Sequence, residues 1–227
     1  MPSLDPLNRQ IVSCRKCPRL VEYREKVARE KRLAFRAWDY WGKPVPGFGD
    51  PRAQLVILGL APAAHGGNRT GRVFTGDRSG DFLYPALYRA GFANQPDSTH
   101  RGDGLALKNV YITAAVRCAP PANRPLPVEL ANCRPYFERE LEILRPRAVL
   151  ALGSIALRAF LGLLKGRGEI PSFAAYRFRH GARYDLPGGL PRVYASYHPS
   201  QQNTFTGKLT EAMLARVLRD IRRFLAR

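Results

Sequence analysis

Three polar side chains in separate loops could together hydrolyse a bond: Asp77, Asn123 and His198. A carboxylate can orient water or stabilise a developing cation, an asparagine can hold that water or a substrate edge, and a histidine can donate to a carbonyl that gains negative charge. Each also has a structural explanation. Asp77 precedes a helical stretch that it could cap, Asn123 lies in a Pro-rich loop where asparagine forms turns, and a single histidine is more often structural.

Asp77 closes a glycine-rich segment, Gly59 to Asp77, which follows the apolar run 53–58. The run predicts a buried strand, and glycines after such a strand let backbone amides approach a ligand. The segment lacks the Gly-Lys-Ser/Thr ending of a P-loop, which excludes that motif. Phe74 could stack on a flat ligand here, or it could simply pack in the core.

The four cysteines form a second set with metal-binding chemistry: Cys14-x2-Cys17, Cys118 and Cys133. Four thiolates suit zinc or an iron–sulfur cluster. Ordinary buried thiols and a redox dithiol are the alternatives, but no strand precedes the Cys-x-x-Cys pair as a redox motif would require. The spacing does not separate zinc from a cluster. The wide second pair lacks the knuckle of a zinc ribbon and favours a cluster slightly.

The elements that must position these residues alternate between strands and helices. Strands are predicted at 53–58, 110–116, 148–152 and 192–196, and helices at 20–35, 81–90, 129–144, 155–164 and 206–225, with a possible hairpin around 176–180. This order predicts one three-layer α/β/α domain over residues 1–227, with a central four-stranded, mostly parallel sheet and an N-terminal metal-binding arm. The carboxyl ends of parallel strands share one edge, so the three polar side chains should meet there.

The charge indicates the class of partner. The chain has 227 residues, 37 of them Lys or Arg against 18 Asp or Glu, for a formal net charge of +19. A folded domain this basic usually binds a polyanion, most often nucleic acid, although a solvated basic surface or a thermophile's arginine preference is the alternative. No segment approaches the ~20 apolar residues of a membrane span, and no signal peptide is evident. We expect a cytoplasmic protein with reduced cysteines.

These motifs combine into a resemblance that runs from Cys14 to about Leu209. The N-terminal Cys-x-x-Cys, the stretch GLAPAAHGGNRTGRVFTGD at 59–77, CAPPANR at 118–124 and HPSQQN at 198–203 resemble the iron–sulfur uracil-DNA glycosylases, and most closely their family 5, or type b. The resemblance implies the uracil-DNA glycosylase-like fold and a [4Fe-4S] cluster on the four cysteines, with zinc the less favoured metal. It also implies a monofunctional enzyme that flips and excises uracil from double- or single-stranded DNA to start base excision repair. We expect a monomer.

Two departures from the sister family 4 bear on the substrate. Leu60 stands where family 4 has Glu, and Ala114 stands where it has an Asn that reads uracil. Both substitutions fit type b and imply a less discriminating pocket that also accepts other deaminated bases such as hypoxanthine and xanthine.

The resemblance assigns roles to individual residues. Asp77 acts on water or the sugar cation, Asn123 helps hold that water or the base edge, and His198 donates to the base carbonyl. The implied substrate contacts are Gly59, Ala61, Ala63, Phe74, Ala114 and Asn203. The segment 201–204 should meet the minor groove, where Phe205 is the one candidate wedge.

Two other classes of protein remain as alternatives. The first is a non-catalytic nucleic-acid-binding module with zinc, and the second is an electron-transfer iron–sulfur protein, which fits the basic charge poorly.

Overall fold

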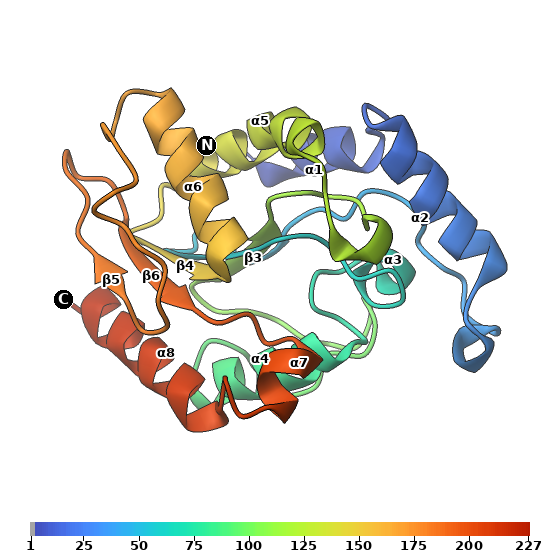
Figure 1. The fold of residues 1–227 in the computed structure, drawn as a ribbon. Coiled ribbons are helices and arrows are strands. Elements are labelled where there is room, and N and C mark those ends of the chain that lie inside the picture. The colour runs from blue at the N-terminus through green and yellow to red at the C-terminus, as the bar shows by residue number, and fades with distance from the viewer. Residues whose placement is uncertain (1–2) are drawn as a thin grey trace.

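The structure, a computed structural model, describes residues 3–227 and contains one six-stranded sheet in the order β1-β3-β2-β4-β6-β5 (Figure 1). Its central strands β3, β2, β4 and β6 are parallel, as predicted. The strands are β1 (Phe48–Gly49), β2 (Leu55–Gly59), β3 (Val110–Ala114), β4 (Ala148–Leu152), β5 (Arg183–Tyr184) and β6 (Arg192–Ser196). The four predicted strands are the four central ones, and the structure adds one short strand at each edge of the sheet. β1 and β5 pair antiparallel over two residues each, too short to leave a periodic pattern.

Helices cover both faces of the sheet and give the predicted three layers. Figure 1 shows α1, α5 and α6 on one face and α4 and α8 on the other. The helices are α1 (Leu4–Val12), α2 (Pro18–Glu30), α3 (Gly67–Thr70), α4 (Arg78–Arg89), α5 (Pro127–Leu144), α6 (Ser154–Gly166), α7 (Gln201–Phe205) and α8 (Glu211–Leu225), with 3-10 turns η1 (Leu33–Phe35) and η2 (Pro121–Asn123).

Strand β2 explains why the central strands are apolar without interruption. Leu55 and Ile57 pack with Leu83 of α4 and the apolar stripe of α8, whereas Val56 and Leu58 pack in the cluster of α5 and α6. Alternate side chains of a strand point to opposite faces, and here helices bury both faces. A continuous apolar run is therefore the expected pattern for such a strand.

Three predicted elements differ from the structure. The predicted helix 20–35 ends at Glu30 and is followed by the separate turn η1. The predicted helix 206–225 begins at Glu211, because Thr210 caps it by accepting from the Met213 amide. No hairpin forms around 176–180; instead β5 pairs with β6. Helix α1 was not predicted.

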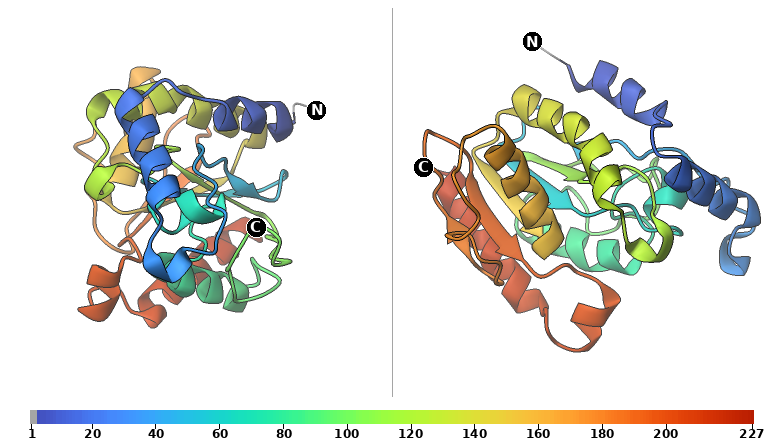
Figure 2. Two further views of the ribbon diagram at one scale, coloured as in Figure 1. Left: turned by 90° about the vertical axis from the view of Figure 1, so that its right-hand side faces the viewer. Right: turned by 45° about the horizontal axis from the view of Figure 1, so that its top comes forward.

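The N-terminal helices lie along the outside of the layers (Figure 2). Helix α1 packs against α5, and α2 contacts α3, which follows β2. The arm thereby reaches the segment that carries the glycine-rich motif. Within residues 3–227, no helix combines the length and the apolar character that crossing a bilayer requires.

Candidate active site

A cavity of about 950 Å³ lies at the edge where the parallel strands end. The segment after β2, the end of β3, the turn η2 and the segment after β6 all contribute to it, as the predicted topology requires. It brings together eight of the predicted site residues: Gly59, Ala61, Ala63, Phe74, Asp77, Ala114, Asn123 and His198. Asn203 is the exception, because it does not line this cavity.

Asp77 is both a helix cap and a cavity residue. Its Oδ1 accepts from the backbone amides of Ser79 and Gly80 at the start of α4, each at 3.0 Å. Its Oδ2 lies against Gly66, where any Cβ would overlap it. Burial raises the pKa of the Asp77 carboxyl, while the two backbone hydrogen bonds and Arg69 lower it. One oxygen is therefore used structurally, and the carboxylate as a whole sits on the cavity wall.

Two glycines make room for Phe74. Its backbone is left-handed, with φ of 50°, and its ring lies so close to Gly59 that a Cβ there would come within 2.9 Å of Cζ. A Cβ at Gly80 would overlap the Phe74 carbonyl. This close packing fixes the ring on the cavity wall, 5.7 Å between centroids from the His198 ring. A flat ring held in this way can stack on a planar ligand.

His198 is a neutral donor or acceptor at ordinary pH. Burial lowers its pKa from 6.5 to about 4, so the imidazole is uncharged at pH 7. The side-chain amide of Asn203 donates to the His198 carbonyl at 2.8 Å. Asn203 thus supports the loop that carries His198 from outside the cavity.

Asn123 lies in a turn, as expected for an asparagine in a Pro-rich loop. Both it and Ala122 have left-handed backbones, with φ of 55° and 51°. The side chain is exposed at the cavity, where it is free to meet a ligand or water.

The cysteines gather around α2 and the start of α5. Cys118 and Cys133 are buried and Cys17 packs against them, and Arg24, which donates to Cys118 Sγ, also donates to the Cys14 carbonyl at 3.4 Å. All four are free thiols. Among residues 3–227, no three His, Cys, Asp or Glu side chains converge as ligands of one metal ion would.

Arg24 provides a test of whether this set suits an anionic group. It is 2% exposed, and its Nη1 donates to Cys118 Sγ at 3.0 Å. Its Nε is buried with no acceptor. Asn132 also donates to Cys17 Sγ, at 3.4 Å. A buried cation and N–H donors directed at sulfur fit a negatively charged thiolate centre.

Sequence reasoning missed the part of the wall that residues 23–35 supply. Tyr23, Arg32 and Phe35 line the cavity, as does Arg69 from the glycine-rich segment. The aromatic residues at 38–41 are the one signal for this wall in the sequence, but the Pro and Gly residues that follow them indicate only a loop.

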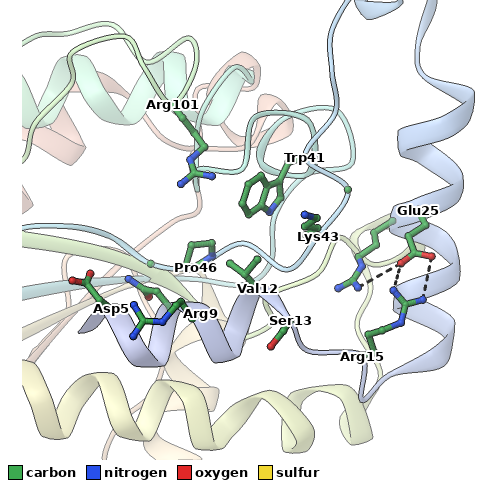
Figure 3. A pocket seen from close by; sticks show the side chains of 14 residues that line it. Asp5, Arg9, Val12, Ser13, Arg15, Glu25, Trp41, Lys43, Pro46 and Arg101 are labelled. Carbon is green, nitrogen blue, oxygen red and sulfur yellow. Dashed lines mark hydrogen bonds and ion pairs between the residues drawn. The ribbon is translucent and has the colours of Figure 1, made fainter. Parts of the chain in front are cut away.

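A second cavity, of about 870 Å³, lies between α1 and the loop 41–47 (Figure 3). Arg9, Lys43 and Arg101 surround it, and the guanidinium of Arg101 lies 4.5 Å from the Trp41 ring. None of the predicted site residues lines this cavity, so we base no catalytic role on it.

The family follows from comparison with known proteins. A model of the uracil DNA glycosylase superfamily matches residues 46–222, and the chain belongs to that superfamily. The chain is 54% identical over 217 residues to the type-5 uracil-DNA glycosylase of Thermus thermophilus, covering 94% of each chain. It is 50% identical over 223 residues to that of Mycobacterium leprae, covering 97% of this chain and 95% of the relative. A type-4 uracil-DNA glycosylase of Pyrobaculum aerophilum is 35% identical over 198 residues, or 87% of this chain and 83% of the relative. Within the superfamily, the chain belongs to the type-5 branch.

Proposed function

We propose that this protein is a monofunctional DNA glycosylase that excises uracil by hydrolysing the bond between the base and deoxyribose, which initiates base excision repair. Membership of the type-5 branch supports uracil excision. The observation that carries the assignment of residues is the convergence of Asp77, Phe74 and neutral His198 on one cavity.

The three side chains suit the charge that develops in the reaction. As the bond to the base breaks, positive charge grows on the sugar and negative charge on the base. The Asp77 carboxylate would orient the attacking water or stabilise the sugar cation, and Asn123 would help to hold that water. A neutral His198 donates to the base carbonyl without needing a proton from solution. Phe74, whose ring packs against Gly59 and lies 5.7 Å from the His198 ring between centroids, would stack on the base.

Flipping the base out of a duplex costs a few kcal/mol, less at a mismatch. Contacts between basic side chains and phosphates can offset that cost, and the net charge of +19 supplies such side chains. We propose that the substrates are double- and single-stranded DNA, that the enzyme acts as a monomer, and that it works in the cytoplasm, where the DNA lies and thiols stay reduced.

The substrate range extends to hypoxanthine and xanthine in this proposal. Ala114 and Leu60 both line the cavity, and neither offers a side-chain hydrogen bond to a base edge. A pocket without such a group discriminates weakly between bases. Ala61 and Ala63 would contact the base or a phosphate through their backbone amides.

One panel of substrates tests this range. Excision of uracil, hypoxanthine and xanthine, each opposite every normal base, should be measured for the wild type and for Ala114→Asn. We expect all three bases to be released by the wild type and the variant to favour uracil. Release of uracil alone by the wild type would remove the broad range and leave uracil excision standing.

We further propose that residues 3–30 form an arm that serves a [4Fe-4S] cluster on Cys14, Cys17, Cys118 and Cys133. The Arg24 and Asn132 contacts to sulfur support an anionic centre there. The wide spacing of Cys118 and Cys133 lacks the knuckle of a zinc ribbon, and this favours a cluster over zinc. When bound, the cluster would tie the arm to α5 and to the loop after β3, and we assign it no chemical step.

A further inference from the structure

Arg69 is a buried cation on the wall of the candidate active site. It is 3% exposed, and its guanidinium lies between two aromatic rings, 3.9 Å from the Phe35 centroid and 4.1 Å from that of Trp38. Its Nε donates to the His65 carbonyl at 2.8 Å and its Nη2 to the Gly76 carbonyl at 2.7 Å. The side chain therefore bridges the two ends of the segment 65–76, which leads directly into Asp77.

The charge of Arg69 is uncompensated, which is unusual for a buried arginine. Arg72, in the same segment and also 3% exposed, pairs with Asp103 at 2.5 Å, and buried Arg117 pairs with Glu140 at 2.6 Å. Within residues 3–227, Arg69 has no carboxylate partner inside 4 Å, and its buried Nη1 has no acceptor. Burying an unpaired charge is costly, and stacking on two rings offsets only part of that cost.

Burial raises the pKa of the Asp77 carboxyl, and the charge of Arg69 acts in the opposite direction. Among the groups that act on the Asp77 carboxyl, Arg69 is the one that favours its ionised form by charge. In return, Tyr40 and Asp77 both favour the charged form of the Arg69 guanidinium. Tyr40 in turn bonds His65 Nδ1 at 3.0 Å, so the aromatic run holds both Arg69 and the residue whose carbonyl it binds.

We propose that Arg69 is a positioning residue for the glycosylase reaction: by joining the His65 and Gly76 carbonyls it fixes the backbone from which Asp77 projects, and it places a buried positive charge on the same cavity wall as that carboxylate. The inference rests on the proposed role of Asp77. It also gives the aromatic segment 35–41 a function, which is to bury the guanidinium between the rings of Phe35 and Trp38 and shield its charge from water.

The other ionisable groups near Asp77 must be considered in any pH experiment. Asp81 on α4 opposes its ionisation, and Tyr84 on the same helix also interacts with it. The remaining ionisable side chains in the cavity lining are Tyr23, Arg32, His65, Arg78 and His198. His198 and His65 both have lowered pKa values because of burial, so they contribute little charge near neutral pH.

The test compares Arg69→Gln, Arg69→Lys and Arg72→Gln. Single-turnover uracil excision is measured from pH 4.5 to 8.5, together with DNA affinity and melting temperature. Arg72→Gln is the matched control, because it removes an equally buried arginine from the same segment but leaves Arg69 in place. Arg69→Lys keeps the charge and loses the fork of N–H donors.

We expect Arg69→Gln to lose about tenfold or more in excision at pH 7 with DNA affinity retained. The acidic limb of its pH–rate profile should move to higher pH, because the Asp77 carboxyl holds its proton more tightly without the Arg69 charge. Arg69→Lys should lose rate but keep the wild-type limb. Arg72→Gln should lower the melting temperature and leave the limb unmoved.

An unshifted acidic limb in Arg69→Gln, or an equal shift in Arg72→Gln, would overturn the proposal. Asp77→Asn separates this failure from that of the proposed function. If Asp77→Asn is inactive while the Arg69→Gln limb is unmoved, only the inference about Arg69 fails. If Asp77→Asn still excises uracil, the role of Asp77 and the inference fall together.

Discussion

The backbone of Gly66 lies directly against the carboxylate of Asp77, so that any side chain at position 66 would overlap Oδ2. Gly66→Ala should therefore displace the carboxylate or the segment before α3. We expect a loss of about 100-fold in single-turnover uracil excision, because small displacements of catalytic groups have large effects on rate. DNA binding should remain.

Gly162→Ala is the control for this substitution. Gly162 lies inside α6 with nothing near its added Cβ, so alanine there should leave excision unchanged and stabilise the helix slightly. Wild-type excision by Gly66→Ala would contradict the close contact between Gly66 and Asp77.

Burial of His198 predicts a dependence of stability on pH. The folded-state pKa of about 4 lies below the ordinary 6.5, so the stabilisation from a neutral His198 is complete above pH 6.5 and is lost as pH falls toward 4. Urea unfolding at pH 7.5 and 4.5 should show that wild type loses roughly 1–3 kcal/mol more than His198→Gln on acidification. Excision should show no ionisation of His198 near pH 6.5. Equal acid losses in the two proteins would contradict the neutral state of this imidazole.

Phe205 is the side chain best placed to act as a wedge. It is 77% exposed at the end of α7, whose first residues, Gln201 and Gln202, line the cavity. A wedge assists unstacking, which a single strand hardly requires. Phe205→Ala should lose about tenfold in excision from duplex DNA and less than about twofold from single strands. Phe173→Ala removes another exposed ring, 41% exposed, that does not line this cavity, and is the control. Equal losses on both substrates would remove the wedge assignment.

The cluster proposal predicts colour and iron. Purified protein should be brown and contain about four irons per chain, and Cys118→Ser should lose both and melt at lower temperature. Iron and sulfide analysis with visible absorbance is the measurement. A colourless, active protein with stoichiometric zinc would overturn the cluster and leave the glycosylase assignment intact.

The sequence predicted the parallel strands because burial on both faces makes each of them apolar. It also predicted the shared edge, and thereby the meeting of Asp77 with His198, since topology alone brings strand ends together. It did not predict edge strands of two residues or the cap that separates α7 from α8. Nor did it predict Arg69 as a cavity residue, because its two aromatic neighbours lie more than 30 positions away in the chain and only the tertiary fold stacks them on it.

The central claim is that Asp77 carries the reaction in the cavity, and the most direct measurement is single-turnover uracil excision by Asp77→Asn with DNA affinity measured in parallel. Asparagine preserves the helix cap and removes the charge. We predict a loss of about 10²–10⁴-fold in excision with affinity unchanged. Because burial disfavours the ionised carboxyl, the variant should also be no less stable than wild type at neutral pH. Excision within about threefold of wild type by a folded, DNA-binding Asp77→Asn protein would contradict the account.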